Sequence, residues 1–116
     1  MTGGPERRAE VAATLRRAAW RVRRGFTTRC LARDVDGDPV GPLDPAAVAW
    51  CAEGAIAAEA PDPALARAAI LAVRETVLLG RMRLADWNDD RARDEEDVAT
   101  LLERAARWLD TDLASA

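Results

Sequence analysis

The chain contains no histidine and no tyrosine, so it lacks the usual general base at neutral pH, the commonest zinc ligand and the phenolic acid. It has two cysteines, Cys30 and Cys51, without a CxxC spacing, and this pattern favours neither a zinc site nor a structural disulfide. No apolar run approaches the roughly 20 residues of a membrane span. Residues 1–10 lack the apolar stretch of a secretion signal, so we expect a cytoplasmic protein.

Glycine-rich phosphate-binding patterns are also missing, and the sequence therefore predicts no cofactor. The spacing of Asp34, Asp36 and Asp38 is reminiscent of a calcium loop. An EF-hand loop, however, needs its glycine later than Gly37 and a glutamate at the twelfth position, which this chain does not supply. The three carboxylates are therefore predicted to form a turn and no metal site. Cys51 is expected to be buried, and reactivity of Cys30 beside an arginine stays a minor hypothesis.

What is present is typical of one small globular domain: 116 residues, 49% hydrophobic, 32% charged, with a net charge of −3. We predict a single helical domain over residues 1–116, with frayed ends at 1–5 and 111–116. All 17 basic residues are arginines and alanine is abundant, a composition typical of a high-GC bacterial genome.

The charge is distributed unevenly along the chain. Residues 1–33 hold nine arginines against two acids, whereas residues 34–116 hold eight arginines against eighteen acids. A basic arm for an anionic partner would give this asymmetry, and so would a basic helix that packs beside acidic helices within the fold or across a dimer. We prefer the second interpretation because the basic segment also carries an apolar stripe.

The stripe predicts a helix from Glu6 to Arg24, since Val11, Leu15, Ala18 and Val22 share one helical face, and Gly25 ends it. At about 100° per residue, Trp20 lies roughly opposite this face. We therefore expect Trp20 to lie on the surface and to belong to an interface, together with its basic neighbours on the helix: Arg17, Arg21 and Arg24.

The remaining pattern predicts an all-α, small four-helix bundle with a loop or short hairpin between its first two helices. The hairpin would turn at Asp36-Gly37, and Asp-Pro pairs at 44–45 and 62–63 read as helix starts. The expected segments are a loop over 27–44, helices over 45–60 and 63–79, a connector over 81–93 and a fourth helix from 94. The predicted core consists of Val11, Leu15, Val22, Val48, Cys51, Ala55, Ile56, Leu65, Val73, Val77, Val98, Leu101, Leu102 and Leu109.

Three motifs carry a resemblance: Ala32-Arg33-Asp34-x-x-Gly37-x-Pro39-Val40, Ala49-Trp50-Cys51-x-x-Gly54-Ala55, and Asp86-Trp87-Asn88-Asp89 followed by Val98 to Leu102. Together they resemble a family of small proteins of unknown function from high-GC bacteria and their phages, over about residues 14–109. In that family the position of Phe26 is more often Trp, and that of Trp20 is usually polar or charged. The resemblance implies a fold and no activity.

From the residues we expect a non-catalytic cytoplasmic accessory or regulatory domain that acts by protein–protein interaction or self-association at the Trp20 and arginine surface. The alternative is a small enzyme or ligand-binding protein of specialised metabolism. Its pocket would lie between the 27–44 loop and the connector, lined by Asp34, Trp50, Trp87, Asn88 and Asp89. Trp87 and its two neighbours could instead be a structural joint at the start of the last helix. Nucleic-acid binding through the arginine-rich first helix is a weaker hypothesis, because the acidic rest of the chain would repel phosphates.

Overall fold

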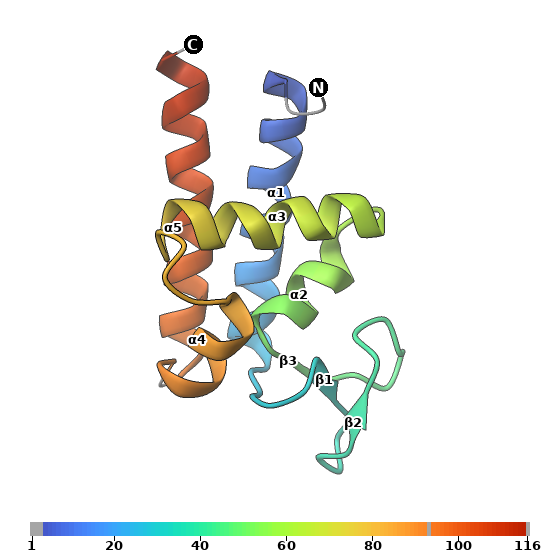
Figure 1. Ribbon diagram of the computed structural model, residues 1–116. Helices are drawn as coiled ribbons and strands as arrows, with labels where there is room; N and C mark the ends of the chain where they lie inside the picture. Colours follow the sequence, from blue (N-terminus) through green and yellow to red (C-terminus); the bar gives the residue numbers. More distant parts are fainter. Residues whose placement is uncertain (1–3, 93, 116) are drawn as a thin grey trace.

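The computed structural model describes residues 4–92 and 94–115. Within these residues it contains five helices and three strands of two residues each (Figure 1). The expectation of an all-α four-helix bundle is therefore wrong, because a small antiparallel sheet and a further helix are present. The elements are α1 (Pro5–Arg24), β1 (Ala32–Arg33), β2 (Pro39–Val40), β3 (Ala49–Trp50), α2 (Ala52–Glu59), α3 (Pro63–Thr76), α4 (Leu84–Asp90) and α5 (Glu95–Ser115).

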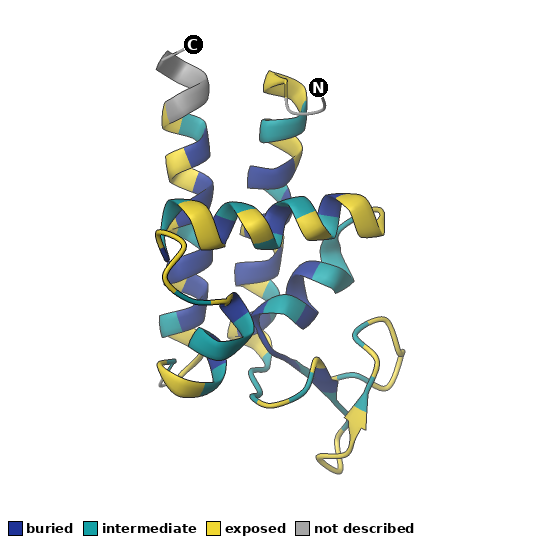
Figure 2. Cartoon of the chain, viewed as in Figure 1, coloured by how far each residue is buried: buried dark blue, intermediate teal, exposed yellow. Residues whose placement is uncertain are grey.

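The two long helices α1 and α5 lie side by side and antiparallel, and α3 crosses in front of both (Figure 1). Small buried side chains, Ala12 and Ala19 on α1 and Ala99 and Ala106 on α5, provide flat faces for close helix packing. Figure 2 shows the buried residues along the sides of these helices that face their neighbours. None of the helices in the described residues combines the length and the apolar character needed to cross a bilayer.

The predicted core is confirmed at most of its positions. The exceptions are Val48, which is 48% exposed, and Val77, which is only partly buried against the core. Val48 is exposed because the helix predicted over 45–60 does not form in its first part.

The Asp44-Pro45 pair starts a turn instead of a helix. The Asp44 Oδ1 atom accepts a hydrogen bond from the Ala46 N–H at 2.8 Å, and the Asp44 carbonyl accepts one from Ala47 at 3.0 Å. The chain then extends through β3, and α2 begins only at Ala52, where the Cys51 Sγ atom accepts from the Gly54 N–H at 3.3 Å. Asp before Pro has the same local chemistry in an Asx turn as in a helix cap, and here the turn forms.

The sheet has the strand order β2-β1-β3, with both pairings antiparallel. Ala32 lies opposite Val40 on one side and Trp50 on the other. The outer edge of β3 forms a parallel bridge with Phe26, so the chain that leaves α1 also joins the sheet. The hairpin predicted around Asp36-Gly37 is confirmed, and Gly37 has a positive φ of 85°.

Two glycines permit close backbone approach where the sheet meets the helices. A Cβ atom at Gly25 would lie 2.0 Å from the Val48 carbonyl oxygen, and one at Gly54 would lie 1.9 Å from the Leu31 carbonyl oxygen. Neither distance is possible for a real side chain. The sheet region can therefore contact the end of α1 and the start of α2 only because both positions lack a side chain.

The boundaries of the other elements differ in detail from the expectation. Helix α3 ends at Thr76, before the expected end at 79, and the predicted connector over 81–93 contains the short helix α4. Helix α1 begins at Pro5 and α5 runs to Ser115, and the fraying expected at 4–5 and 111–115 stays a prediction. The fraying expected at residues 1–3 and 116 lies outside the described residues.

Candidate functional site

Asn88 joins three distant segments of the chain. Its side chain is fully buried, its Oδ1 atom accepts from the Ala52 N–H at 2.9 Å, and its Nδ2 atom donates to the Thr27 carbonyl at 3.3 Å. The adjacent Asp89 accepts from the Arg29 N–H at 2.8 Å. A structural joint is thus present at Asn88. The sequence suggested that it would hold the start of the last helix, whereas Asn88 binds the first turn of α2.

The residues expected to line a pocket between the 27–44 loop and the connector have different surroundings among the described residues. Trp50 is 8% exposed and its indole N–H donates to the Pro42 carbonyl at 3.1 Å. It lines a cleft beside α1, whereas Trp87 lines a separate cavity of about 400 Å³ with Arg91, Leu101 and Arg104. Asn88 and Asp89 form hydrogen bonds with backbone groups, and the expected pocket stays a prediction.

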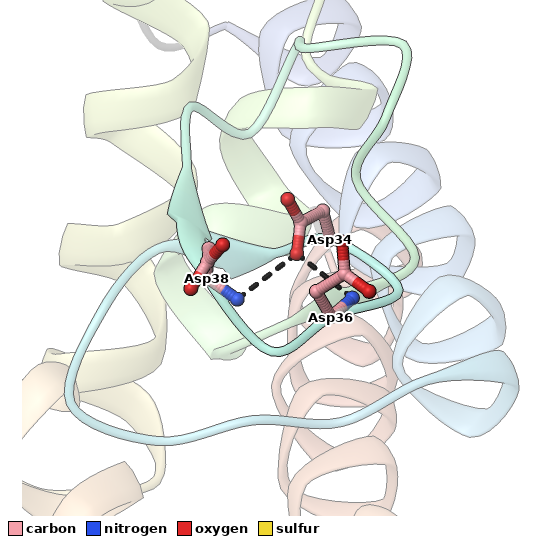
Figure 3. A group of neighbouring side chains, drawn as sticks. All are labelled: Asp34, Asp36 and Asp38. Atoms are coloured by element: carbon pink, nitrogen blue, oxygen red, sulfur yellow. Dashed lines mark hydrogen bonds between the residues drawn. The ribbon is translucent and has the colours of Figure 1, made fainter.

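Asp34, Asp36 and Asp38 gather at the tip of the β1–β2 hairpin (Figure 3), with carboxylate oxygens within 4.8 Å of one another. The Asp34 Oδ1 atom accepts from the Asp36 N–H at 3.0 Å and from the Asp38 N–H at 2.9 Å. This is the hydrogen bonding of an Asx turn, in which the side chain replaces a backbone acceptor. The turn accounts for the position of Asp34 without a metal ion.

Basic side chains of α1 pair with acids elsewhere in the fold. Arg16 pairs with Asp110, and Arg23 contacts Glu103 at 2.6 Å and Glu96 at 2.7 Å. Hydrogen bonds from Arg23 hold the pKa values of Glu96 and Glu103 below their usual range, and the same contacts raise the pKa of Arg23. The uneven charge of the sequence is thus partly neutralised by pairing between α1 and α5.

The predicted interface residues divide into two groups on α1. Arg21 lies over the Trp50 ring at 4.5 Å and donates to Glu59 at 2.7 Å, while Arg17 lies 3.5 Å from the same carboxylate. Arg24 lies over the Trp20 ring at 4.5 Å. Trp20 is 58% exposed, which confirms its predicted position on the surface; its role in an interface stays a prediction.

A cleft of about 570 Å³ opens beside this part of α1. Arg21 and Arg24 line it from the helix, Trp50 lies in its wall, and the loop over 41–48 forms the opposite side. Leu43 and Val48, which also line it, are 74% and 48% exposed. Arg24 is exposed and forms no ion pair with any described residue. We call Trp20, Arg24, Leu43, Val48 and this cleft the Trp20 surface.

Leu43 and Val48 are the site residues that sequence reasoning missed. The helix expected over 45–60 placed Val48 in the core, and Leu43 stood in a loop with no distinguishing pattern. Both lie beside the Asx turn that forms at Asp44 in place of the expected helix start.

The thiols offer little chemistry. Cys51 is buried, and burial raises the pKa of its thiol, which opposes formation of the nucleophilic thiolate. Cys30 is partly buried and its Sγ atom donates to the Ala32 carbonyl at 3.4 Å. With no histidine in the chain, neither thiol has the usual base for activation.

The model of a family of unknown function, DUF6197, matches residues 6–107. No curated protein and no solved structure matches the chain.

Proposed function

Because the chain belongs to the DUF6197 family, whose function is unknown, we propose from its surface chemistry that it is a non-catalytic accessory domain that works by protein–protein contact at the Trp20 surface. The observation that carries this proposal is the exposed indole of Trp20, 58% accessible, with the guanidinium of Arg24 stacked on it. Tryptophan and arginine are the residue types most enriched at binding hot spots.

The apolar part of this surface is available to a partner. Trp20, Leu43 and Val48 expose 58%, 74% and 48% of their surfaces, and covering them would gain about 25 cal/mol for each square ångström of apolar area. The stack also orders the Arg24 side chain before binding, which lowers the entropy lost on association. The surface thus combines apolar area with a preorganised charge.

We propose a second copy of the chain as the partner. The cleft is lined by both signs of charge, since Arg24 and Asp44 lie on its two sides. A two-fold arrangement places the same patch on both subunits, so each Arg24 can meet an Asp44 carboxylate of the other copy. One surface that carries both partners of an ion pair is suited to this arrangement.

The mass in solution, measured by light scattering, tests the proposal on three proteins. We expect the wild type to be a dimer, Trp20→Glu a folded monomer, and Trp108→Glu a dimer. Trp108 is a matched control because it is 51% exposed on α5 and is not among the residues that line the cleft. A monomeric wild type at high concentration, or a Trp20→Glu variant that stays dimeric, would overturn self-association.

A charge exchange tests the pairing itself. Arg24→Asp alone should weaken the dimer, because it places two acids in the same contact. Arg24→Asp combined with Asp44→Arg should restore part of the affinity, although loss of the Asp44 turn hydrogen bond costs some stability. If the double variant is as weak as the single one, Arg24 and Asp44 do not meet across the interface.

A further inference from the structure

A second concave surface lies on α3 and shares no residue with the Trp20 surface. This groove has a volume of about 520 Å³ and is bounded by α3, the first turn of α2 and the start of α4. Four apolar side chains and four charged ones line it: Ala68, Ile70, Leu71 and Leu84, and Glu53, Arg67, Arg74 and Arg83. We call it the α3 groove.

The apolar side chains form its floor. Leu84 is almost fully buried, Ile70 is partly buried against the core, and Leu71 is 49% exposed. Small-molecule sites are typically concave and mostly apolar, with a few polar groups that orient the ligand, and their volumes begin at about 300 Å³. The groove therefore has the size and floor of a site for a small apolar molecule.

The charged side chains around it are mainly cationic, with three arginines against one glutamate. Arg83 pairs with Asp86 at 3.2 Å, whereas Arg67 and Arg74 form no ion pair with any described residue. These two arginines are seven positions apart on α3, about 10 Å at 1.5 Å per residue, with Leu71 between them. A cation thus stands at each end of the exposed apolar patch.

Glu53 is the acid in the lining, and its charge is offset in two ways. It lies in the first turn of α2, where the helix dipole favours a negative group. It also lies near Arg83: the hydrogen bond and charge of Asp86, and then the charge of Glu53, raise the pKa of Arg83. The side of the groove along α3 therefore keeps its positive charge.

We propose that the α3 groove binds a small organic anion with an apolar body. The apolar body lies on Leu71 and Leu84, and its carboxylate or other anionic group is held by the arginine at one end of the patch, Arg67 or Arg74. Arginine suits this role because its guanidinium donates two parallel hydrogen bonds to a carboxylate.

NMR titration with three probes tests the ligand class on the full chain. Naphthalene-2-carboxylate and decanoate represent an aromatic and an aliphatic body, and 2-acetylnaphthalene is an uncharged counterpart of the first. We expect saturable shifts of the Ile70, Leu71 and Leu84 methyl signals with at least one anion, and binding of the neutral probe about tenfold weaker than that of its anionic counterpart. Which anion binds more tightly distinguishes an aromatic from an aliphatic ligand.

Three variants locate the site. Leu71→Glu and the double variant Arg67→Ser with Arg74→Ser should each weaken anion binding by about tenfold or more, and these side chains are exposed enough for the fold to persist, as circular dichroism would show. Arg81→Ser is the matched control, because Arg81 is exposed and outside the lining. The proposal is overturned if neither anion gives saturable shifts, if the neutral probe binds equally well, or if the control loses as much affinity as the groove variants.

Discussion

Two arginine–tryptophan stacks lie on the C-terminal half of α1 and share one distance, 4.5 Å from guanidinium carbon to ring centre. Arg21 stacks on Trp50, which is 8% exposed, and the same arginine also binds Glu59. Arg24 stacks on Trp20, which is 58% exposed and lies on the same helix. The same contact therefore has a different consequence in each place: the first connects α1 to β3 and α2, and the second orders a free surface.

The comparison shows how to separate a binding residue from a structural one when both have the same chemistry. Cation–π contacts are worth about 0.5–1 kcal/mol when exposed and about 2 kcal/mol when desolvated. The buried stack thus contributes to stability, while the exposed one contributes little until a partner removes water from it.

The largest expected difference is in the effect of removing each ring. Trp50→Ala should lower the free energy of unfolding by about 3–5 kcal/mol, because it removes a buried aromatic side chain and its hydrogen bond to Pro42. Trp20→Ala should change it by about 0.5 kcal/mol or less. Urea denaturation checks both, at a concentration where each protein is monomeric by mass. Equal losses for the two variants would contradict the division between the stacks.

The next largest effect is expected at Glu59, the carboxylate that Arg21 of the buried stack also binds. Glu59→Gln should lower the free energy of unfolding by about 1 kcal/mol, because Arg21 and Arg17 lose their shared carboxylate. Asp90→Asn is a control at an exposed acid on α4. Urea denaturation should show a smaller loss for the control, and the mass in solution should not change for either. A Glu59→Gln variant that dissociates the dimer would show that the buried stack also serves the interface.

A smaller effect on stability is expected for Arg23, which contacts the carboxylates of Glu96 and Glu103. The pKa values of Glu96 and Glu103 are lowered from 4.5 in the folded state, so their stabilising contribution is present above about pH 4.5 and lost as the pH falls through the lowered values. Thermal melts between pH 6 and pH 3 should therefore show a steeper acid loss for wild type than for Arg23→Gln. Parallel curves would mean that the bridge contributes nothing to folding.

The smallest expected effect is none at all. The hairpin whose β1 strand pairs with Trp50 is held by its own Asx turn, so millimolar calcium should leave the melting temperature unchanged. Binding to the native state alone would raise stability by mass action. A saturable rise of several degrees in the melting temperature that disappears in Asp36→Asn would show that the three carboxylates bind calcium. The hairpin that pairs with Trp50 would then be stabilised by a metal ion.

The parts of the fold that the sequence predicts are those whose signals lie close together in the chain. Helix α1 has its apolar stripe and its glycine stop within one segment, and Asp62 caps α3 through a 2.8 Å hydrogen bond to the Leu65 N–H. Because helix geometry fixes the angle between neighbouring residues, the exposure of Trp20 also follows from the sequence.

The parts that it does not predict depend on partners far along the chain. β3 forms because Val48 and Trp50 donate to the carbonyls of Arg33 and Gly25, which no local pattern reveals. The partners of Asn88 lie 36 and 61 positions away. Helix α4, with seven residues, is too short for its periodicity to be recognised. The sequence therefore predicted the part of the Trp20 surface that lies on α1, and it did not predict the part formed by Leu43 and Val48 in the loop.

Gly25 and Gly54 set a limit on which other sequences can adopt this structure. Each position faces a backbone carbonyl oxygen that cannot give way like the end of a flexible side chain, so even alanine would force the sheet region away from the helices. Surface residues on α1 or in the hairpin can be exchanged without that consequence. A redesign of this scaffold for a new partner therefore has freedom at the exposed positions of α1 that form no ion pair with a described residue, provided that these two glycines are left unchanged.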